Sequence, residues 1–339
     1  MQEPNVFTSY AAHEQAAPLQ PISCTPKDLE GSEVEIQVEY CGICHSDISM
    51  IDNEWGFSQY PLVAGHEVIG KIARVGSNVS KFKEGQTVGL GWHSGYCNTC
   101  NYCESGDHNL CSSAQATIVN RFGGFSERVV ADQSSVIEIP SELNQKTAAP
   151  LLCGGITVFN PLLEFDIKPT DTVAVIGLGG LGHLAVRYLK AWGCDVTAFT
   201  SNADKTQTAL ELGAKRVVNY TNTEDLEALS KRFDFIISTV NLDLNWSAIL
   251  NTLKPKGRLH VVGVPQNDMS IAAFPLISGQ RSISGSPVGS PKAIKTMLEF
   301  SARHEIEPIA EFWPASKINE ALDHLRQGKA RYRIILDFT

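Results

Sequence analysis

Four cysteines crowd into the stretch GYCNTCNYCESGDHNLC at positions 95–111, and their spacing suits a metal ion. They are Cys97, Cys100, Cys103 and Cys111, in the pattern C-x2-C-x2-C-x7-C. Four thiolates complete the tetrahedral shell of Zn²⁺ and leave no position for substrate. The loop is polar, so a metal would supply its order. We predict a structural zinc site. Four unrelated thiols are the alternative, and His108 could compete as a ligand.

A glycine-rich segment, VAVIGLGGLGHLAV, suggests a nucleotide cofactor. Gly177, Gly179 and Gly182 follow an apolar strand and open a helix, as a dinucleotide fold requires. Glycines there allow a tight turn and close approach of the backbone to a pyrophosphate at the helix N-terminus. The alternative is a glycine-rich turn that binds nothing.

The next strand indicates which cofactor is used. NAD-binding folds commonly carry Asp or Glu about 20 residues beyond the glycines, where the carboxylate binds the ribose 2′-hydroxyl. Here CDVTAFTSNADK ends in Thr200, Ser201 and Asn202, with Lys205 close behind. Hydroxyls and an ammonium suit a 2′-phosphate, so NADP(H) is predicted, with Asp204 pointing away. The same hydroxyls could simply cap a helix.

A third group is scattered over CGICHSD, GHE and LLCGG. Cys44, His66 and Cys153 would supply two thiolates and an imidazole, a ligand set that leaves a catalytic zinc with an open position. Spacing alone does not select them. His66 could be a core histidine, and Cys41 with Cys44 could form a C-x-x-C redox pair.

The elements that must position these residues follow two patterns along the chain. Runs 33–41, 66–76 and 87–92 are β-rich, whereas beyond about residue 150 apolar strands alternate with helix-length segments. The alternation predicts a parallel sheet covered on both faces. Its expected helices are 181–193, 204–214, 226–233 and 246–257, and two more lie at 291–305 and 317–328, before a closing strand at 331–338. The fold class is α/β, a β-rich domain plus a doubly wound sheet.

Composition excludes several classes of protein. The net charge is −9, from 28 basic and 37 acidic residues, which argues against nucleic acid as the partner of a zinc ribbon. No apolar run is long enough to span a membrane, and the N-terminus does not resemble a signal peptide. We therefore expect a cytoplasmic protein. Nine cysteines in a reducing compartment are more consistent with metal ligands or catalytic thiols than with disulfides.

These motifs together resemble the zinc-dependent medium-chain alcohol dehydrogenases over essentially the whole chain. CHSD, LLCGGITVF and RYR are similar to the cinnamyl-alcohol-dehydrogenase-like branch, and DNEWGFSQYPLVAGHEVIG to bacterial NADPH-dependent aldehyde reductases. The resemblance implies a GroES-like catalytic domain, 1–152 and 290–339, and a Rossmann domain, 153–289. It assigns the catalytic zinc to Cys44, His66 and Cys153, and Cys41 ends a β run where we expect it to be packed.

The resemblance also implies roles around that zinc. Ser46 would hydrogen-bond the reacting oxygen and begin a proton relay through the cofactor ribose. Asp47 would orient His66, and Glu67 would do similar work or ligate zinc transiently. Trp55 and Trp92 are expected to wall the substrate pocket, although either could be an ordinary core aromatic. Many relatives have a histidine where this chain has Ser49, which leaves the end of the relay open, with Asp52 or water as candidates.

Further residues are expected at the cofactor. His45 and Arg333 would contact the pyrophosphate, although either could be solvated or salt-bridged. The remaining contacts implied are Thr157, Gly180, Leu181, Val240, Val262 and Ser286.

The function implied is zinc-dependent, NADPH-linked reduction of aliphatic and aromatic aldehydes to primary alcohols, and the reverse. The alternatives are an NAD-dependent alcohol dehydrogenase acting mainly in oxidation and a non-catalytic zinc-binding regulator. A zinc-free quinone reductase should lack the ligands. Segment 271–286 follows the expected last Rossmann strand and is expected to pair with its copy in a homodimer.

Overall fold

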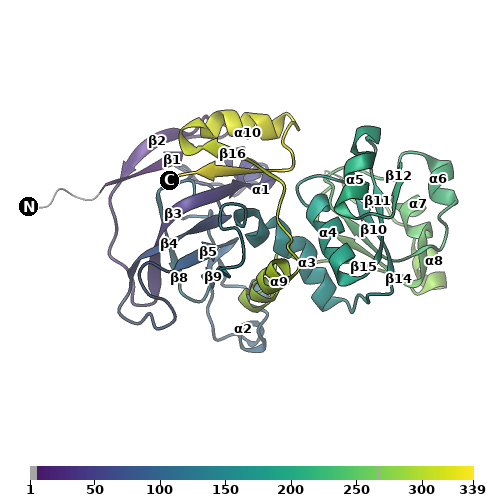
Figure 1. Ribbon diagram of the computed structural model, residues 1–339, viewed down its shortest axis with the longest axis horizontal. Helices are drawn as coiled ribbons and strands as arrows, with labels where there is room; N and C mark the ends of the chain where they lie inside the picture. The colour runs from purple at the N-terminus through teal and green to yellow at the C-terminus, as the bar shows by residue number, and fades with distance from the viewer. Residues whose placement is uncertain (1–5, 266) are drawn as a thin grey trace, which may run out of the picture. The chain divides into compact units, whose positions relative to one another are not determined.

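The computed structural model describes residues 6–265 and 267–339, and they form two compact units. One unit runs to Ile156 and resumes from Val288 to Thr339, and the other is Thr157–Pro287. The boundaries expected from the resemblance, after residues 152 and 289, lie a few residues from these. Figure 1 labels the elements of both units.

The first unit is built on a sheet with the strand order β16-β17-β3-β4-β5-β9, with β8 also paired to β3. The central strand β3 (Glu33–Ile43) pairs antiparallel with β4 (Val68–Val75) and with β17 (Arg333–Asp337), so the end of the chain lies beside its beginning. The other strands are β5 (Thr87–Leu90), β8 (Arg128–Asp132), β9 (Ile137–Glu138) and β16 (Ala310–Pro314), with the pairs β1 (Phe7–Ala11) and β2 (Gln20–Cys24), and β6 (His93–Gly95) and β7 (Gln115–Ala116).

The described part of the first unit also contains four helices and three 3-10 turns. They are α1 (His45–Ile51), α2 (Asn101–Ser105), α9 (Pro291–Arg303) and α10 (Ile318–Arg326), with single 3-10 turns η1 (His108–Leu110), η2 (Ala149–Leu152) and η4 (Ala315–Lys317). Helix α3 (Gly154–Glu164) crosses the boundary between the units.

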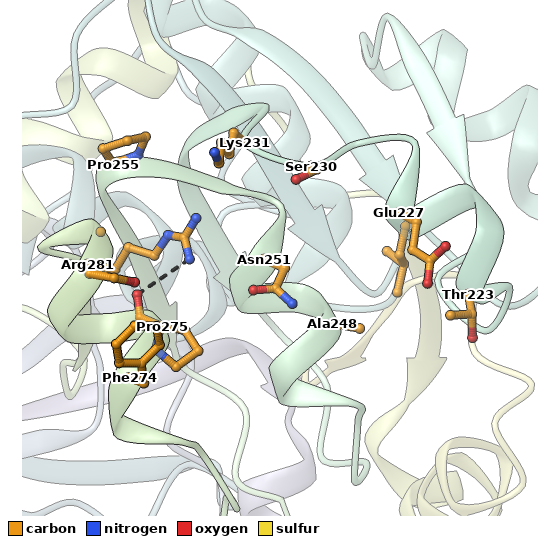
Figure 2. Close-up of a pocket in the computed structure, with 13 residues that line it drawn as sticks. Thr223, Glu227, Ser230, Lys231, Ala248, Asn251, Pro255, Phe274, Pro275 and Arg281 are labelled. Carbon is orange, nitrogen blue, oxygen red and sulfur yellow. Dashed lines mark hydrogen bonds between the residues drawn. The ribbon is translucent and has the colours of Figure 1, made fainter.

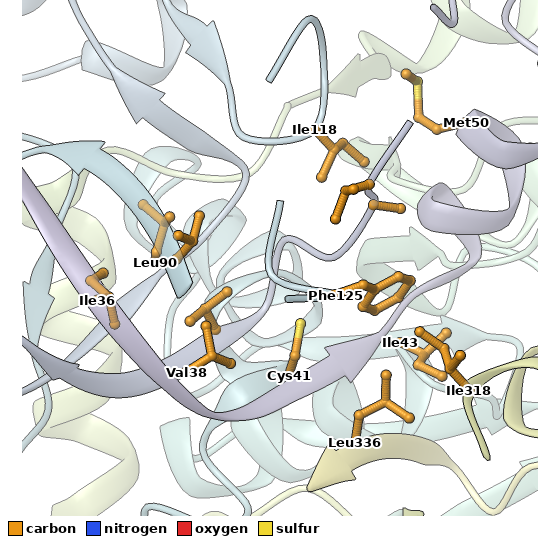
Figure 3. Close-up of a cluster of buried hydrophobic side chains, with 14 of the residues drawn as sticks. Ile36, Val38, Cys41, Ile43, Met50, Leu90, Ile118, Phe125, Ile318 and Leu336 are labelled. Atoms are coloured by element: carbon orange, nitrogen blue, oxygen red, sulfur yellow. The ribbon is translucent and has the colours of Figure 1, made fainter. Parts of the chain in front are cut away.

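A buried apolar cluster holds the strands of this unit together. It includes Ile36, Cys41, Phe125 and Leu336, which Figure 3 draws converging between the strands. Cys41 is fully buried there, and its thiol donates to the carbonyl of Gly42 at 3.6 Å. Its place in the core is that of a packing residue.

The second unit is a six-stranded parallel sheet in the order β12-β11-β10-β13-β14-β15. The strands are β10 (Thr172–Ile176), β11 (Asp195–Phe199), β12 (Arg216–Val218), β13 (Phe233–Ser238), β14 (Leu253–Val261) and β15 (Ser282–Gly285). The helices are α4 (Gly182–Trp192), α5 (Thr206–Leu212), α6 (Thr223–Glu227), α7 (Trp246–Asn251) and α8 (Ala273–Gly279), with the 3-10 turn η3 (Ala203–Lys205). Helices α4 and α5 contact each other on one face, and α6 and α7 on the other (Figure 1).

Three expectations for this unit were wrong in detail. The helix expected at 226–233 begins earlier and ends at Glu227, because Asn222 caps it and Lys231 turns the chain at φ 54° before β13. The helix expected at 246–257 stops at Asn251, and β14 begins at Leu253. Segment 271–286 does not follow the last strand but contains it, as α8 and the edge strand β15.

Candidate active site and zinc centres

Cys44, His66 and Cys153 come from three separate parts of the first unit and meet at one point. Cys44 is the N-cap of α1, His66 lies just before β4, and Cys153 follows the turn η2. The sulfurs of Cys44 and Cys153 are 3.9 Å apart, and His66 Nε2 is 3.3 Å from the Cys153 sulfur. With a carboxylate oxygen of Glu67, these ligand atoms all lie within 4.8 Å of one another.

The arrangement fits zinc. Two sulfurs bound about 2.3 Å from a tetrahedral zinc lie roughly 3.8 Å apart, which matches the observed separation. Two thiolates and one imidazole leave a fourth position for a substrate oxygen, or for Glu67.

Asp47 ties the three parts together. It is fully buried, and its Oδ1 lies 2.8 Å from His66 Nδ1 and accepts from the backbone N–H of Gly65 at 2.8 Å. Its Oδ2 accepts from the N–H of Cys44 at 2.9 Å. Since Asp47 engages Nδ1, the other ring nitrogen of His66 is left facing the sulfurs, the usual arrangement of a zinc-ligating histidine.

Glu67 and Arg333 form a buried ion pair beside the three ligands. An Arg333 N–H donates to Glu67 Oε1, while Oε2 has no hydrogen-bond partner within residues 6–265 and 267–339. A Cβ at residue 42 would overlap this oxygen, so the glycine there makes room for the carboxylate. Arg333, expected at the pyrophosphate, is only 5% exposed.

The electrostatics reflect close packing of ionisable groups. Burial lowers the pKa of His66, but Asp47 and Cys44 outweigh it and leave that pKa well above its ordinary value. A hydrogen bond from Cys153 lowers the pKa of the Cys44 thiol, and the same bond raises the pKa of Cys153. Burial raises the pKa of Glu67 to about 7, although Arg333 opposes the rise. A divalent cation would hold both sulfurs as thiolates.

The relay candidates lie on α1 and on the loop after it. The Ser46 hydroxyl is 3.8 Å from the Cys44 sulfur. Ser49 is 4% exposed, and its hydroxyl donates to Glu54 Oε2 at 2.6 Å. Asp52 instead accepts from Arg326 at 2.7 Å. The sequence analysis did not single out Glu54, although it lies in the stretch DNEWGFSQYPLVAGHEVIG.

An aromatic series runs from His66 to the protein surface. Trp92 meets the His66 ring edge-on at a centroid distance of 5.0 Å, and Trp55 meets Trp92 edge-on at 6.0 Å. Phe57, which the sequence did not single out, stacks on Trp55 at 5.8 Å, and both are exposed, at 49% and 38%. His45, at the start of α1, is also exposed.

The four-cysteine lobe forms a second closed group. The Cys97 sulfur lies 3.9 Å from that of Cys103 and 3.5 Å from that of Cys111, and all four sulfurs lie within 4.8 Å of one another. The His108 ring packs edge-on against Tyr96 at 5.2 Å, and this residue is outside the ligand group. Four sulfurs at tetrahedral spacing again fit zinc.

The glycine loop of the second unit follows β10 and leads into α4. Gly177 has φ 90°, and a Cβ at Gly182 would overlap the carbonyl oxygen of Gly177. A Cβ at Gly179 would meet nothing within 4 Å, so the backbone there can be closely approached. Gly180 and Leu181 complete the loop.

The segment after β11 has its own hydrogen bonds. Asn202 Oδ1 accepts from the N–H of Asp204 at 2.9 Å and so caps η3, and Thr200 Oγ1 accepts from the N–H of Asn202 at 3.1 Å. Lys205 Nζ donates to the carbonyl of Leu178 at 2.9 Å, which draws the ammonium to the glycine loop. Ser201 lies 3.4 Å from the Tyr220 hydroxyl.

The other expected cofactor residues are spread over the second unit. Val240, Val262 and Ser286 follow β13, β14 and β15, at the carboxyl end of the parallel sheet that also carries the glycine loop. Thr157 lies within α3.

The second unit also has a hollow that is lined by none of these expected cofactor residues. Figure 2 shows it among α6, α7 and α8, near the amino ends of β13 and β14, with Arg281 donating to the carbonyl of Pro275. None of the residues lining it was predicted as a site residue.

Comparison with known proteins defines the class. Residues 30–141 match the alcohol dehydrogenase GroES-like domain, and residues 180–303 match the zinc-binding dehydrogenase family. The chain is 54% identical over 331 residues to aldehyde reductase AdhA from Synechocystis sp., covering 98% of each protein.

Solved structures agree. A cinnamyl alcohol dehydrogenase from Sorghum bicolor superposes with a TM-score of 0.94 at 36% identity, and CAD from Helicobacter pylori complexed with NADP(H) with 0.89 at 32%, each over 98% of both chains. The chain belongs to the zinc-dependent medium-chain alcohol dehydrogenases. Within them it falls in the cinnamyl-alcohol-dehydrogenase-like branch, and it is an enzyme.

Within the described ranges, no helix is long and apolar enough to cross a membrane.

Proposed function

We propose that this enzyme reduces aldehydes to primary alcohols with NADPH, and catalyses the reverse reaction, with zinc held by Cys44, His66 and Cys153. The meeting of these three ligands in one group, with His66 and Cys153 buried and Ser46 beside Cys44, carries the proposal. The similarity to aldehyde reductase AdhA supports aldehydes as substrates, and the similarity to a structure complexed with NADP(H) supports the cofactor.

When bound, zinc polarises the aldehyde carbonyl and NADPH supplies the hydride. The chain's own residues do the rest. Asp47 fixes the ring of His66, and Ser46 delivers the proton that the product oxygen needs. Ser49 passes a replacement proton inward from Glu54, whose exposed carboxyl exchanges with water. Ser49 can pass a proton along its hydrogen bond to Glu54, whereas Asp52 is engaged by Arg326. Glu54 therefore replaces Asp52 as the outer end of the relay.

The aromatic series Trp92, Trp55 and Phe57 supports a substrate class. Aromatic side chains bury apolar groups of many shapes because apolar burial is non-directional. We assign a broad range of aliphatic and aromatic aldehydes, with Trp55 and Trp92 as pocket walls.

Preference for NADPH over NADH rests on the end of β11. Thr200, Ser201 and Asn202 carry no charge that would repel a 2′-phosphate, and the ammonium of Lys205 lies at the glycine loop. The capping role of Asn202 uses its side-chain oxygen, so Thr200, Ser201 and Lys205 are left as the main contacts. For the pyrophosphate we propose His45, which is exposed at the start of α1, and the same role for Arg333 stays a prediction, because its guanidinium is paired with Glu67.

The working form we propose is a cytoplasmic homodimer. Phe274 and Ile277 of α8 are 76% and 73% exposed, beside the edge strand β15. Pairing with a second copy would cover both features.

Metal analysis combined with an assay of NADPH oxidation tests the activity. We expect two zinc ions per chain and turnover of short aliphatic and aromatic aldehydes, with NADPH preferred over NADH. Cys153→Ser should remove one zinc and the activity. A protein with two zinc ions and no turnover would favour the non-catalytic regulator, and equal use of NADH would contradict the cofactor assignment.

A further inference from the structure

A histidine in the second unit is bound on both sides by serine hydroxyls. His260 lies on β14 and is fully buried, and the neighbouring parallel strand β15 places Ser284 directly opposite it. His260 Nδ1 lies 2.9 Å from Ser284 Oγ, and Nε2 lies 3.1 Å from Ser286 Oγ. Both ring nitrogens are therefore engaged, and Ser284, His260 and Ser286 form one hydrogen-bonded chain.

The surroundings keep the imidazole uncharged. Phe165 and Phe235 pack on the ring at centroid distances of 5.0 and 6.0 Å. Burial lowers the pKa of His260 to about 4, and the charge of Arg258 acts in the same direction. A neutral imidazole has one donor nitrogen and one acceptor nitrogen. Whichever tautomer is present, Nε2 fixes whether Ser286 accepts or donates, so the hydroxyl is not a free rotor.

Ser286 lies where a ligand can reach it. It follows β15 at the carboxyl end of the sheet, the end at which the glycine loop leaves β10. Ligands of open parallel sheets bind outside the carboxyl ends of the strands. Ser286 is half-buried, in contrast to His260. His260 binds the Ser286 hydroxyl from inside the protein, and Ser286 stays partly accessible to a ligand.

We propose that His260 is a positioning residue that orients the Ser286 hydroxyl toward the carboxamide of the nicotinamide ring. A carboxamide has both a carbonyl acceptor and an amino donor, so it can pair with either state of Ser286. The inference rests on the proposed use of NADPH and adds a residue to it. Nothing in the sequence RLHVVGV at 258–264 indicates this role, because His260 is a buried residue of an apolar strand.

Binding measurements separate this role from a structural one. The full-length zinc-loaded protein is titrated by calorimetry with NADPH and with 2′-phospho-ADP-ribose, which lacks the nicotinamide. His260→Leu and Ser286→Ala should each weaken NADPH binding by roughly 3- to 10-fold, the range of one net hydrogen bond. Binding of the fragment should be unchanged. The double variant should bind NADPH no more weakly than the weaker single variant, because both changes remove the same contact.

Thr197→Val is the matched control. Thr197 is a buried residue of the same sheet whose hydroxyl has no hydrogen-bond partner in the described part of the chain, so neither affinity should change. If His260→Leu does not fold, Ser284→Ala replaces it, because this change removes the other hydrogen bond of His260. Ser284→Ala should then weaken NADPH binding by itself. Added to Ser286→Ala, it should cause no further loss of NADPH affinity. Equal weakening of both ligands, or additive losses, would overturn the inference. An unmutated protein that binds neither ligand would overturn the proposed function itself, whereas variants that bind NADPH like the parent would overturn only the role of His260.

Discussion

In the proposed relay, Ser49 and Glu54 carry a proton between the zinc ligands and solvent. The hydrogen bond between these two side chains is 2.6 Å long and joins a buried hydroxyl to an exposed carboxylate. Glu54→Gln would keep an oxygen that accepts from Ser49 but could not take up a proton. We expect kcat to fall by roughly 10- to 100-fold, at the lower end of what proton transfer contributes, with little change in the KM for NADPH.

Steady-state kinetics at saturating NADPH check this prediction. Asp52→Asn is the control, because Asp52 lies two residues away and is engaged by Arg326. Parental turnover in Glu54→Gln, or an equal loss in Asp52→Asn, would rule out Glu54 as the end of the relay.

At the same scale, sequence alone predicts local ligand sets better than dispersed ones. The four lobe cysteines lie within one loop, so their spacing alone predicts a four-sulfur zinc site. Cys44, His66 and Cys153 required the resemblance, because three distant segments meet only after β3, β4 and η2 have formed. Glu54 and His260 could not be predicted at all. Their roles depend on a loop turned at Asn53, with φ 53°, and on the register of β14 with β15.

At the scale of elements, the four-cysteine lobe is the part that depends most on its metal. Its helix α2 has only five residues, too few to be stable alone, and Tyr102 and Leu110 are 53% and 46% exposed. Cys103→Ser should lose one zinc and lower the unfolding temperature by roughly 5–10 °C, since metal binding contributes several kcal/mol to the order of such loops.

Metal analysis and calorimetry on three variants separate the two centres. Cys153→Ser should also lose one zinc but abolish turnover with a smaller change in unfolding temperature. Cys24→Ser, at a cysteine of β2 outside both ligand groups, should keep both metals. If Cys103→Ser retained two zinc ions, the lobe could not be a four-sulfur site.

Elements with a sustained period were predictable and short ones were not. The segments 181–193 and 291–305 match α4 and α9 closely, since each carries an apolar face over about three turns. In the segments 226–233 and 246–257, local pattern does not show where the helix ends, because the turn at Lys231 and the start of β14 at Leu253 end the helices α6 and α7 early. The sheet order with β15 at the edge is a property of long-range pairing that local pattern does not contain.

At the scale of the whole molecule, the outer edge of the sheet in the second unit is the feature that favours association with a second copy. Among the described strands, β15 pairs only with β14, so its other edge has no strand partner. Helix α8, just before it, presents Phe274 and Ile277 outward. Unpaired strand edges and adjoining apolar side chains promote association, and a two-fold axis at this edge would bury both in a closed dimer rather than an open aggregate.

Charges placed on α8 should therefore break the dimer without disturbing the chemistry. We expect light scattering to report a dimer for the unmutated protein at micromolar concentration and a monomer for Phe274→Asp combined with Ile277→Asp, because two buried carboxylates would lack partners. Leu210→Asp is the matched control, since Leu210 is an exposed apolar residue of α5 in the same unit. It should remain dimeric. The zinc content of the α8 variant should stay at two per chain, as both ligand groups lie in the first unit. A monomeric unmutated protein would contradict the assignment of this edge, and dissociation of Leu210→Asp would show that the effect of the α8 variant came from added charge alone.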